Sequence, residues 1–259
     1  MTDATVQKIM ADVMAHAAFA PYATDPVRTL DEAYRLQDAL AEQLTACADR
    51  QAVAGWKIAA NAPHLLEKFA LEEPLSGRVF ISQTHQGPAR LKAATFRQFA
   101  FEPEIAAIMK TDLEVSDGPA DRQDVIAAID RFVPAIELLD MRDIDMPSID
   151  IADVVAQNIS NEGAVIGGPG MAPQDLNPAS LRTEVSVNGK VELQVTGAAP
   201  QDPIDAVIWL ARHLTKRGLH LQAGQIVLCG THCPIWYHGD PGEIVVTMTG
   251  LGEVSLSLG

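Results

Sequence analysis

The sequence has few basic residues and no long apolar runs. Its 259 residues include 19 Lys and Arg against 34 Asp and Glu, a formal net charge of -15. Nucleic acids and anionic membrane surfaces are bound by basic patches, so this balance argues against both as partners. No apolar run approaches the roughly 20 residues of a membrane span. An anionic substrate would therefore depend on local positive charge, from a metal ion or from well-placed Lys and Arg side chains.

Cysteine is also scarce, with only Cys47, Cys229 and Cys233. An odd, small number predicts a reducing compartment without a disulfide framework. The first twenty residues lack a basic start and are typical of an amphipathic helix rather than a signal peptide. We therefore expect a cytoplasmic protein.

Several catalytic signatures are missing. The glycines at 167, 168 and 170 match neither a phosphate-binding loop nor a dinucleotide fingerprint, and no nucleophile elbow or Ser-His-Asp signature is visible. The Cys229–Cys233 spacing matches neither zinc knuckles nor redox dithiols, which predicts free thiols and no zinc. His232 lies between them, directly after a predicted strand, and is a candidate for a ligand contact.

Without repeats or linkers, the chain is expected to form one compact catalytic unit, residues 51–259, with an N-terminal helical extension, residues 1–50. The class is α+β. Thr29 and Glu32 have the spacing of a capping box, and Asp202, Pro203 and Gly218 bound a clear helix. Further helices are predicted at 121–132 and 151–160. Strands are predicted at 52–60, 79–82, 101–109, 134–140, 164–168, 225–230, 243–250 and 253–259, with a hairpin at Asn188-Gly189 and a loop at 82–94.

Two carboxylates, Glu102 and Glu104, lie two residues apart in the apolar run FEPEIAAIM. Side chains alternate along a strand, so both point to one face, where burial of two like charges requires a cation. Glu137, in PAIELLD, adds a third carboxylate. Three carboxylates on strands suit a hard cation such as Mg²⁺ or Mn²⁺. The alternative is that Glu102 and Glu104 line the solvated face of a half-exposed strand.

Lys57 stands alone among apolar neighbours in GWKIAA. A lysine on a buried strand needs an anionic partner or loses its charge. The functional interpretation is a general acid or a binder of a substrate carboxylate. The alternative is a lysine at a strand end, with a buried stem and a solvated head.

The chain resembles the 2-keto-4-pentenoate hydratase and 4-oxalocrotonate decarboxylase family of the fumarylacetoacetate hydrolase superfamily. The resemblance rests on the order of five segments, which are GWKIAA, FEPEIAAIM, PAIELLDMR, IADVVAQNISNEGAVIGG and the C-terminal run through LQAGQIVLCGT. The resemblance implies a mixed β-roll or sandwich with helices outside and N-terminal helices. It implies Mg²⁺ or Mn²⁺ held by Glu102, Glu104 and Glu137, with Lys57 as the strand lysine. It maps a Gly-Ser or Gly-Thr turn onto Gly230-Thr231, and Thr231 and His232 become candidate substrate-binding residues.

The sequence departs from this family at the position after Glu73-Pro74. Leu75 replaces an acidic residue that often takes part in acid–base catalysis in this family.

Taken as a whole, the resemblance implies a metal-dependent lyase that acts on small 2-oxo or 2-hydroxydienoate acids, most simply a hydratase of aromatic catabolism. Lys57, Glu102 and Glu104 would take part in catalysis. A 2-oxo-enedioate decarboxylase, an acylpyruvate-type C–C hydrolase and a non-catalytic partner subunit remain alternatives. A homo-oligomer is expected.

Overall fold

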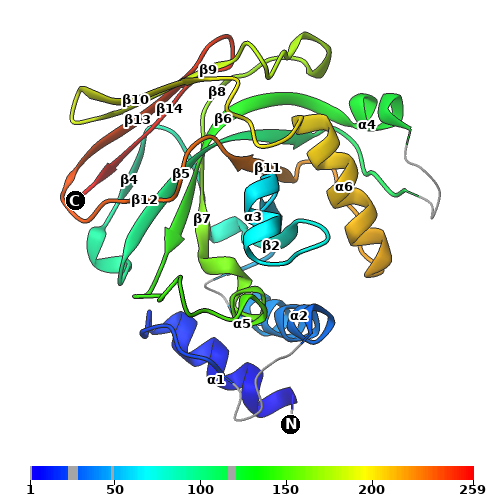
Figure 1. Cartoon of the computed structure of the whole chain (residues 1–259), viewed down its shortest axis with the longest axis vertical. Coiled ribbons are helices and arrows are strands. Elements are labelled where there is room, and N and C mark those ends of the chain that lie inside the picture. Colours follow the sequence, from blue (N-terminus) through cyan, green and yellow to red (C-terminus); the bar gives the residue numbers. More distant parts are fainter. Residues whose placement is uncertain (1, 23–28, 48–49, 116–120) are drawn as a thin grey trace.

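The computed structural model describes residues 2–22, 29–47, 50–115 and 121–259, which form two β-sheets with helices outside them (Figure 1). The first sheet contains β1 (Val53–Ala59), β2 (Leu75–Phe80), β3 (Thr84–Gln86), β5 (Phe99–Met109), β6 (Ile129–Asp140), β7 (Asn161–Ile166), β11 (Ile226–Thr231) and β12 (Trp236–Tyr237). The second contains β4 (Ala89–Leu91), β8 (Gly168–Pro169), β9 (Arg182–Val187), β10 (Lys190–Thr196), β13 (Gly242–Met248) and β14 (Gly252–Leu258).

The first sheet curls into a roll. Its order is β2-β1-β11-β5-β6-β7-β3, with β12 also on β5, and β2 near one edge packs against β7 near the other. Alternate residues of β5 and β6 therefore point inward, where small and aliphatic side chains such as Ala106, Ala135 and Leu228 form a core of their own. Glu102 and Glu104 share the parity of Ala106, and Glu137 shares that of Ala135. The register thus places all three glutamates on the inner face of the roll.

The outward face of the roll packs against the second sheet, whose order is β10-β9-β13-β14-β4 with β8 on β14. Phe101 and Ile136 of the roll join Val246 and Leu256 of the second sheet in the main hydrophobic core, and all four are fully or almost fully buried. This sandwich fixes β5 and β6 from behind, so their inward side chains have a rigid support.

Helices cover the remaining surfaces of the roll. They are α1 (Thr2–Met14), α2 (Leu30–Ala46), α3 (Pro63–Lys68), α4 (Arg122–Ala128), α5 (Ile151–Ala156) and α6 (Pro203–Lys216). In Figure 1, α1, α2 and α5 gather at one end of the roll, whereas α4 and α6 lie along its side. The first group shares a hydrophobic cluster that also includes Leu75 of β2 and Leu139 of β6.

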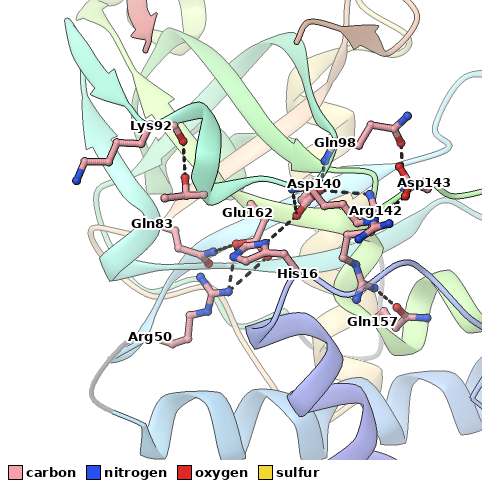
Figure 2. Close-up of polar contacts among 12 residues, drawn as sticks. His16, Arg50, Gln83, Lys92, Gln98, Asp140, Arg142, Asp143, Gln157 and Glu162 are labelled. Atoms are coloured by element: carbon pink, nitrogen blue, oxygen red, sulfur yellow. Dashed lines mark hydrogen bonds and ion pairs between the residues drawn. The ribbon is translucent and has the colours of Figure 1, made fainter. Parts of the chain in front are cut away.

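Buried polar contacts also attach the N-terminal segment to the roll (Figure 2). His16 Nδ1 lies 2.7 Å from Asp140 Oδ2, and the backbone N–H groups of Arg97 and Gln98 also donate to Asp140. Arg50 pairs with Glu162 at 3.1 Å. The N-terminal segment is therefore held by polar contacts as well as by apolar packing. The division into an extension and a catalytic unit stays a prediction.

Most predicted elements are present. Thr29 and Asp202 cap their helices through side-chain hydrogen bonds, Gly218 follows α6 with a φ of 70°, and Asn188 and Gly189 form the turn between β9 and β10 with positive φ. Pro103 lies where β5 passes from β11 to β12, at an interruption of the ladder, as expected for a residue without an N–H.

Several boundaries were predicted wrongly. The strand expected over 79–82 is β2, which begins at Leu75 and ends at Phe80, and the helix expected over 151–160 ends at Ala156. Two further differences have a common cause. The helix expected over 121–132 ends at Ala128, because Ile129 to Phe132 pair with β5 instead. The loop expected over 82–94 contains the short strands β3 and β4, which pair in parallel with β7 and β14. In both segments, backbone pairing with a distant strand determines the conformation, and local periodicity does not record it.

Candidate active site

Three glutamates meet on the inner face of the roll. Glu102 and Glu137 are directly opposed across the β5–β6 ladder, and Glu104 is the next inward residue of β5. One carboxylate oxygen from each lies within 4.8 Å of the others. All three side chains are buried, at 9% exposure for Glu102, 1% for Glu104 and 0% for Glu137. The alternative of a solvated strand face is therefore wrong.

This arrangement is electrostatically unfavourable without a further cation. Burial, together with the neighbouring charge of Glu137, raises the pKa of Glu102 to about 8. Burial and the charges of Glu137 and Glu102 raise the pKa of Glu104 well above its usual range. In addition, Glu137 Oε2 is buried without a hydrogen-bond partner. Hard oxygen donors, excess negative charge and an unsatisfied oxygen all fit a divalent cation. That the three glutamates ligate such an ion stays a prediction.

Lys57 faces the same cluster from β1. Its Nζ lies 2.7 Å from Glu137 Oε1, and the side chain is 3% exposed. Burial by itself would lower the pKa of Lys57, but the charges of Glu137, Glu102 and Glu104 and the hydrogen bond to Glu137 raise it. Lys57 is therefore a buried ammonium group, and the alternative of a solvated head at a strand end is wrong.

Two further groups orient the carboxylates, and sequence reasoning gave neither of them this role. Asn161 Nδ2 donates to Glu137 Oε1 at 2.9 Å, and the Gly230 N–H donates to Glu104 Oε2 at 2.7 Å. Gly230 has a φ of 113°, and a Cβ there would lie 2.6 Å from the side chain of Asn61, so only glycine fits. The Gly-Thr turn recognised in the sequence thus presents a backbone donor to a buried carboxylate.

A cavity of about 640 Å³ opens beside this cluster. Lys57, Glu102 and Glu104 line its charged part. The rest of the wall comes from the end of β1, from α3, from the segment after β6, from α5 and from the loop after β11. Charged groups at one end and an extensive apolar wall are the usual composition of a small-molecule site.

Thr231 and His232 also line the cavity. His232 is 5% exposed, its Nδ1 lies 2.7 Å from the hydroxyl of Thr183 on β9, and its Nε2 has no hydrogen-bond partner. Burial lowers the pKa of His232 to about 4, so the ring is neutral near pH 7. The partner Thr183 was not singled out from the sequence, because it comes from the second sheet.

The position that departs from the family pattern also borders the cavity. Leu75 is the first residue of β2, is 1% exposed and lines the cavity wall. Glu73, two residues earlier, points elsewhere and accepts a hydrogen bond from Trp209 Nε1 of α6 at 3.3 Å. Neither residue therefore supplies an acidic group to the cavity.

The two cysteines that flank His232 have separate surroundings. The Cys229 thiol is buried and approaches the backbone oxygens of Val227 and Pro203, whereas Cys233 lines the cavity. Burial raises the pKa of Cys233 to about 12, so this thiol stays protonated. Among the described residues, the Glu102, Glu104 and Glu137 cluster is the candidate metal site. The absence of zinc at 229–233 stays a prediction.

Comparison with known families identifies the fold. The model of the fumarylacetoacetate (FAA) hydrolase C-terminal family matches residues 67–257, which include β5, β6 and most of the cavity. The chain belongs to the FAA hydrolase C-terminal family. The resemblance recognised in the sequence is thereby confirmed, and so is the expected mixed α/β roll.

Named relatives narrow the comparison. The chain is 31% identical over 235 residues to a 2-hydroxyhexa-2,4-dienoate hydratase of Comamonas testosteroni, covering 89% of this chain and 87% of the relative. It is 28% identical over 233 residues to a 2-keto-4-pentenoate hydratase of Paraburkholderia xenovorans, covering 89% and 84%. A 4-oxalocrotonate decarboxylase of Pseudomonas putida is 33% identical over 156 residues, covering 60% and 58%.

A solved structure has the same fold over almost the full chain. It is a 4-oxalocrotonate decarboxylase from Pseudomonas putida G7 complexed with magnesium and adipate, with a TM-score of 0.89, 24% identity and coverage of 99% of this chain and 97% of that one. The agreement extends to the N-terminal helices, which the match to residues 67–257 does not include. No helix within the described ranges has the length and apolar character needed to span a membrane.

Proposed function

We propose that this chain is a divalent-metal-dependent hydratase that acts on small 2-hydroxydienoate or 2-oxo acids, in the breakdown of aromatic compounds. The observation that carries the proposal is the buried cluster of Glu102, Glu104, Glu137 and Lys57 at the end of an apolar cavity. The relatives named hydratases, similar over 89% of the chain, support the reaction type.

Glu102, Glu104 and Glu137 would hold Mg²⁺ or Mn²⁺, and solved structures of the same fold contain magnesium, calcium or manganese. A bound divalent ion supplies positive charge that stabilises an enolate and attracts the substrate carboxylate. Glu102 and Glu104 are catalytic residues in this sense. The Gly230 N–H and Asn161 keep the carboxylates oriented, which is the usual task of groups behind metal ligands.

Lys57 contributes a fixed positive charge beside the carboxylates. Because its pKa is raised, it is an ammonium group near pH 7, suited to bind a substrate carboxylate or to give a proton while an enolate forms or collapses. In a 2-hydroxydienoate, transfer of the hydroxyl proton to the far end of the diene gives a conjugated 2-oxo acid. Addition of water across the remaining double bond then completes the hydration.

His232 and Thr231 are the proposed polar contacts for the substrate. If the Thr183 hydroxyl donates to Nδ1 of the neutral ring, both groups are satisfied and the ring proton resides on Nε2. With the opposite tautomer, the hydroxyl hydrogen of Thr183 would need another buried acceptor. The Nε2–H is therefore a buried donor without a protein partner, on a residue that lines the cavity, and we propose that it meets a substrate oxygen. It offers polar chemistry that Leu75 cannot supply.

A 4-oxalocrotonate-type decarboxylase is the second candidate, because a decarboxylase is 33% identical over 156 residues and the same charges stabilise an enolate after loss of CO₂. A C–C hydrolase would need a water activated for attack on a carbonyl. A non-catalytic partner subunit is disfavoured by the complete set of carboxylates.

We also propose a cytoplasmic homo-oligomer, for which gel filtration with light scattering tests the assembly.

The reaction is tested with metal-free protein to which Mg²⁺ or Mn²⁺ is returned. Loss of the conjugated chromophore of 2-hydroxypenta-2,4-dienoate and mass identification of the product report hydration. Release of CO₂ from 2-oxohex-3-enedioate without hydration of the dienoate would replace the hydratase by the decarboxylase. Cleavage of an acylpyruvate into two acids would favour the hydrolase. No turnover with either metal would leave the partner subunit.

A further inference from the structure

One edge of the first sheet lies beside Lys57. β2 is the last strand at that edge, and its Gly77 is paired with Lys57 of β1. The backbone groups of alternate residues in an edge strand have no neighbouring strand to bond to, and burying them without partners is unfavourable. In β2 this concerns Ser76 and Arg78, which are both buried.

Side chains replace the missing strand. The Tyr34 hydroxyl accepts a hydrogen bond from the Ser76 N–H at 3.0 Å, and Gln37 Nε2 donates to the Ser76 oxygen at 3.0 Å. At Arg78 a single side chain does both, because Asn158 Oδ1 accepts from the N–H at 2.6 Å and Nδ2 donates to the oxygen at 2.8 Å. A primary amide has the donor and the acceptor of a peptide group, so Asn158 supplies the bonds of a neighbouring strand residue.

The turn that contains Asn158 is strained. Asn158, Ile159 and Ser160 have φ values of 60°, 54° and 55°, and the N–H of Asn161 closes the turn on the Asn158 oxygen. L-residues adopt this left-handed conformation mostly one at a time, so a run of three is unusual. Such a conformation persists only where its surroundings hold it. The two hydrogen bonds of the buried Asn158 amide to Arg78 provide that restraint.

The same turn leads directly to the buried carboxylates. Asn161 follows it, and its Nδ2 donates to Glu137 Oε1 at 2.9 Å. Lys57 Nζ lies 2.7 Å from the same oxygen. One of these two groups comes from the strand beside β2 and the other from the residue after the turn. Their positions relative to each other therefore depend on how β2 is joined to the turn.

Gly77 shows how closely these parts approach. A Cβ at Gly77 would lie 3.1 Å from Cγ of Lys57 and 3.2 Å from the backbone oxygen of Asn158. The stem of Lys57 and the turn thus both pack on the backbone of β2, where a methyl group has no room. Close approach, and not an unusual backbone conformation, requires glycine at this position.

From these contacts we propose that Asn158 is a positioning residue, whose amide closes the roll between β2 and β7 and thereby sets the contact between the Lys57 ammonium group and Glu137. It acts through Gly77 on one side and through Asn161 on the other. A misplacement of about 1 Å can cost about 100-fold in rate. The consequence for turnover rests on the proposed function, whereas the consequence for the ion pair does not.

Asn158→Gly is the direct test, because glycine accepts the left-handed conformation and removes only the amide. In metal-free protein labelled with nitrogen-15 lysine, the buried Lys57 ammonium group should give an NMR signal protected from exchange with water. The other lysines of the described residues are exposed. The variant should lose the protected signal. In the metal-loaded variant, kcat for the dienoate should fall about 100-fold. KM should change less than about threefold, because the side chains that line the cavity are unchanged.

Two further variants separate positioning from general support of the strand. Tyr34→Phe removes a hydrogen bond from the same edge of β2, but at Ser76, which stands opposite Ile58. It should lower stability in urea unfolding and keep the protected signal. Gly77→Ala keeps both Asn158 hydrogen bonds but places a methyl group against the Lys57 stem, so it should lose the signal. Equal effects of Tyr34→Phe and Asn158→Gly on the signal would overturn the proposal.

The measurements separate this inference from the proposed function. If Asn158→Gly loses the signal and the wild type hydrates the dienoate about 100-fold faster, both stand. If the signal is lost but the wild type hydrates no dienoate, the hydratase proposal fails and the positioning role remains. If the wild type is a hydratase and Asn158→Gly keeps the protected signal, the hydratase stands and the positioning role is refuted. A wild type without a protected signal would also refute it.

Discussion

Lys57→Met removes the ammonium group that lies 2.7 Å from Glu137 and leaves the three glutamates facing one another in a buried site. Methionine keeps the length of the stem, so the packing of β1 changes little. The substitution therefore isolates the contribution of the charge, both to stability and to turnover.

The expected loss of stability follows from the burial of both partners. Breaking a buried ion pair by removing one partner costs about 3–5 kcal/mol. We expect the lower end, about 3 kcal/mol, in metal-free protein, because the raised pKa values of Glu102 and Glu104 let protons replace part of the missing charge. A divalent ion at about 100 times its Kd stabilises the folded state by about 2.7 kcal/mol. Without the competing ammonium group, the variant should bind that ion more tightly than the wild type and therefore gain more stability from it.

Urea unfolding in EDTA measures the loss of stability caused by the substitution, and urea unfolding in saturating Mg²⁺ or Mn²⁺ measures how much the metal ion restores. The gap between variant and wild type should be about 3 kcal/mol in EDTA and narrower with metal, while turnover of the dienoate remains strongly reduced. Lys190→Met is the matched control, because Lys190 pairs with Glu192 on the exposed strand β10, and its replacement should change stability by less than about 0.5 kcal/mol.

Two results would contradict this reasoning. Equal stability of Lys57→Met and wild type in EDTA would mean that the glutamates do not depend on this ammonium group. Full turnover of the variant would remove Lys57 from the proposed mechanism, whatever its effect on stability.

Three further predictions concern neighbouring parts of the molecule. Glu104→Gln keeps an acceptor for the Gly230 N–H but removes a charge. Calorimetry should therefore show a metal affinity reduced by about 100-fold or more, while the stability in EDTA is unchanged or increased. Undiminished metal affinity would exclude Glu104 as a ligand. Nitrogen-15 shifts of His232 should report a neutral ring with its proton on Nε2, and Thr183→Val should shift this tautomer equilibrium; a proton on Nδ1 in the wild type would reverse the assigned donor. Burial and the nearby Arg217 lower the pKa of His213 to about 4, so its stabilising contribution is complete above pH 6.5 and is lost as the pH falls toward 4. Relative to His213→Gln, the wild type should lose about 3 kcal/mol over that interval in urea unfolding, and parallel pH profiles would contradict the assignment.

The sequence was most informative where the spacing of neighbouring residues alone placed the functional side chains. Glu102 and Glu104 alternate with apolar residues, and that spacing alone places both carboxylates on one face. The residue that faces these carboxylates from the neighbouring strand was harder to predict. Glu137 was proposed as the third carboxylate because it lies in a second apolar run. That it stands opposite Glu102 depends on the register of β5 and β6, which 19 residues separate in the chain and which no local pattern determines.

Contacts between distant elements could not be predicted in this way. His232 and Thr183 belong to different sheets, and only the packing of the two sheets brings the ring and the hydroxyl within 2.7 Å. The helix expected to extend to Phe132 ends at Ala128 for a related reason. Ile129 and Phe132 have the i, i+3 spacing of a helix, but this segment pairs with β5 across a register shift at Met109 and is a strand.

The position of Leu75 follows from where β2 begins. Because the strand starts at Leu75, this side chain enters the cavity wall, while Glu73 lies before the strand and contacts α6. A carboxylate at position 75 would add another negative charge to a cavity that already contains Glu102 and Glu104 and would itself have to be desolvated. Leucine avoids this cost and extends the apolar wall. The same replacement that removes an acid from the family pattern thus leaves His232 among the neutral polar side chains that line the cavity.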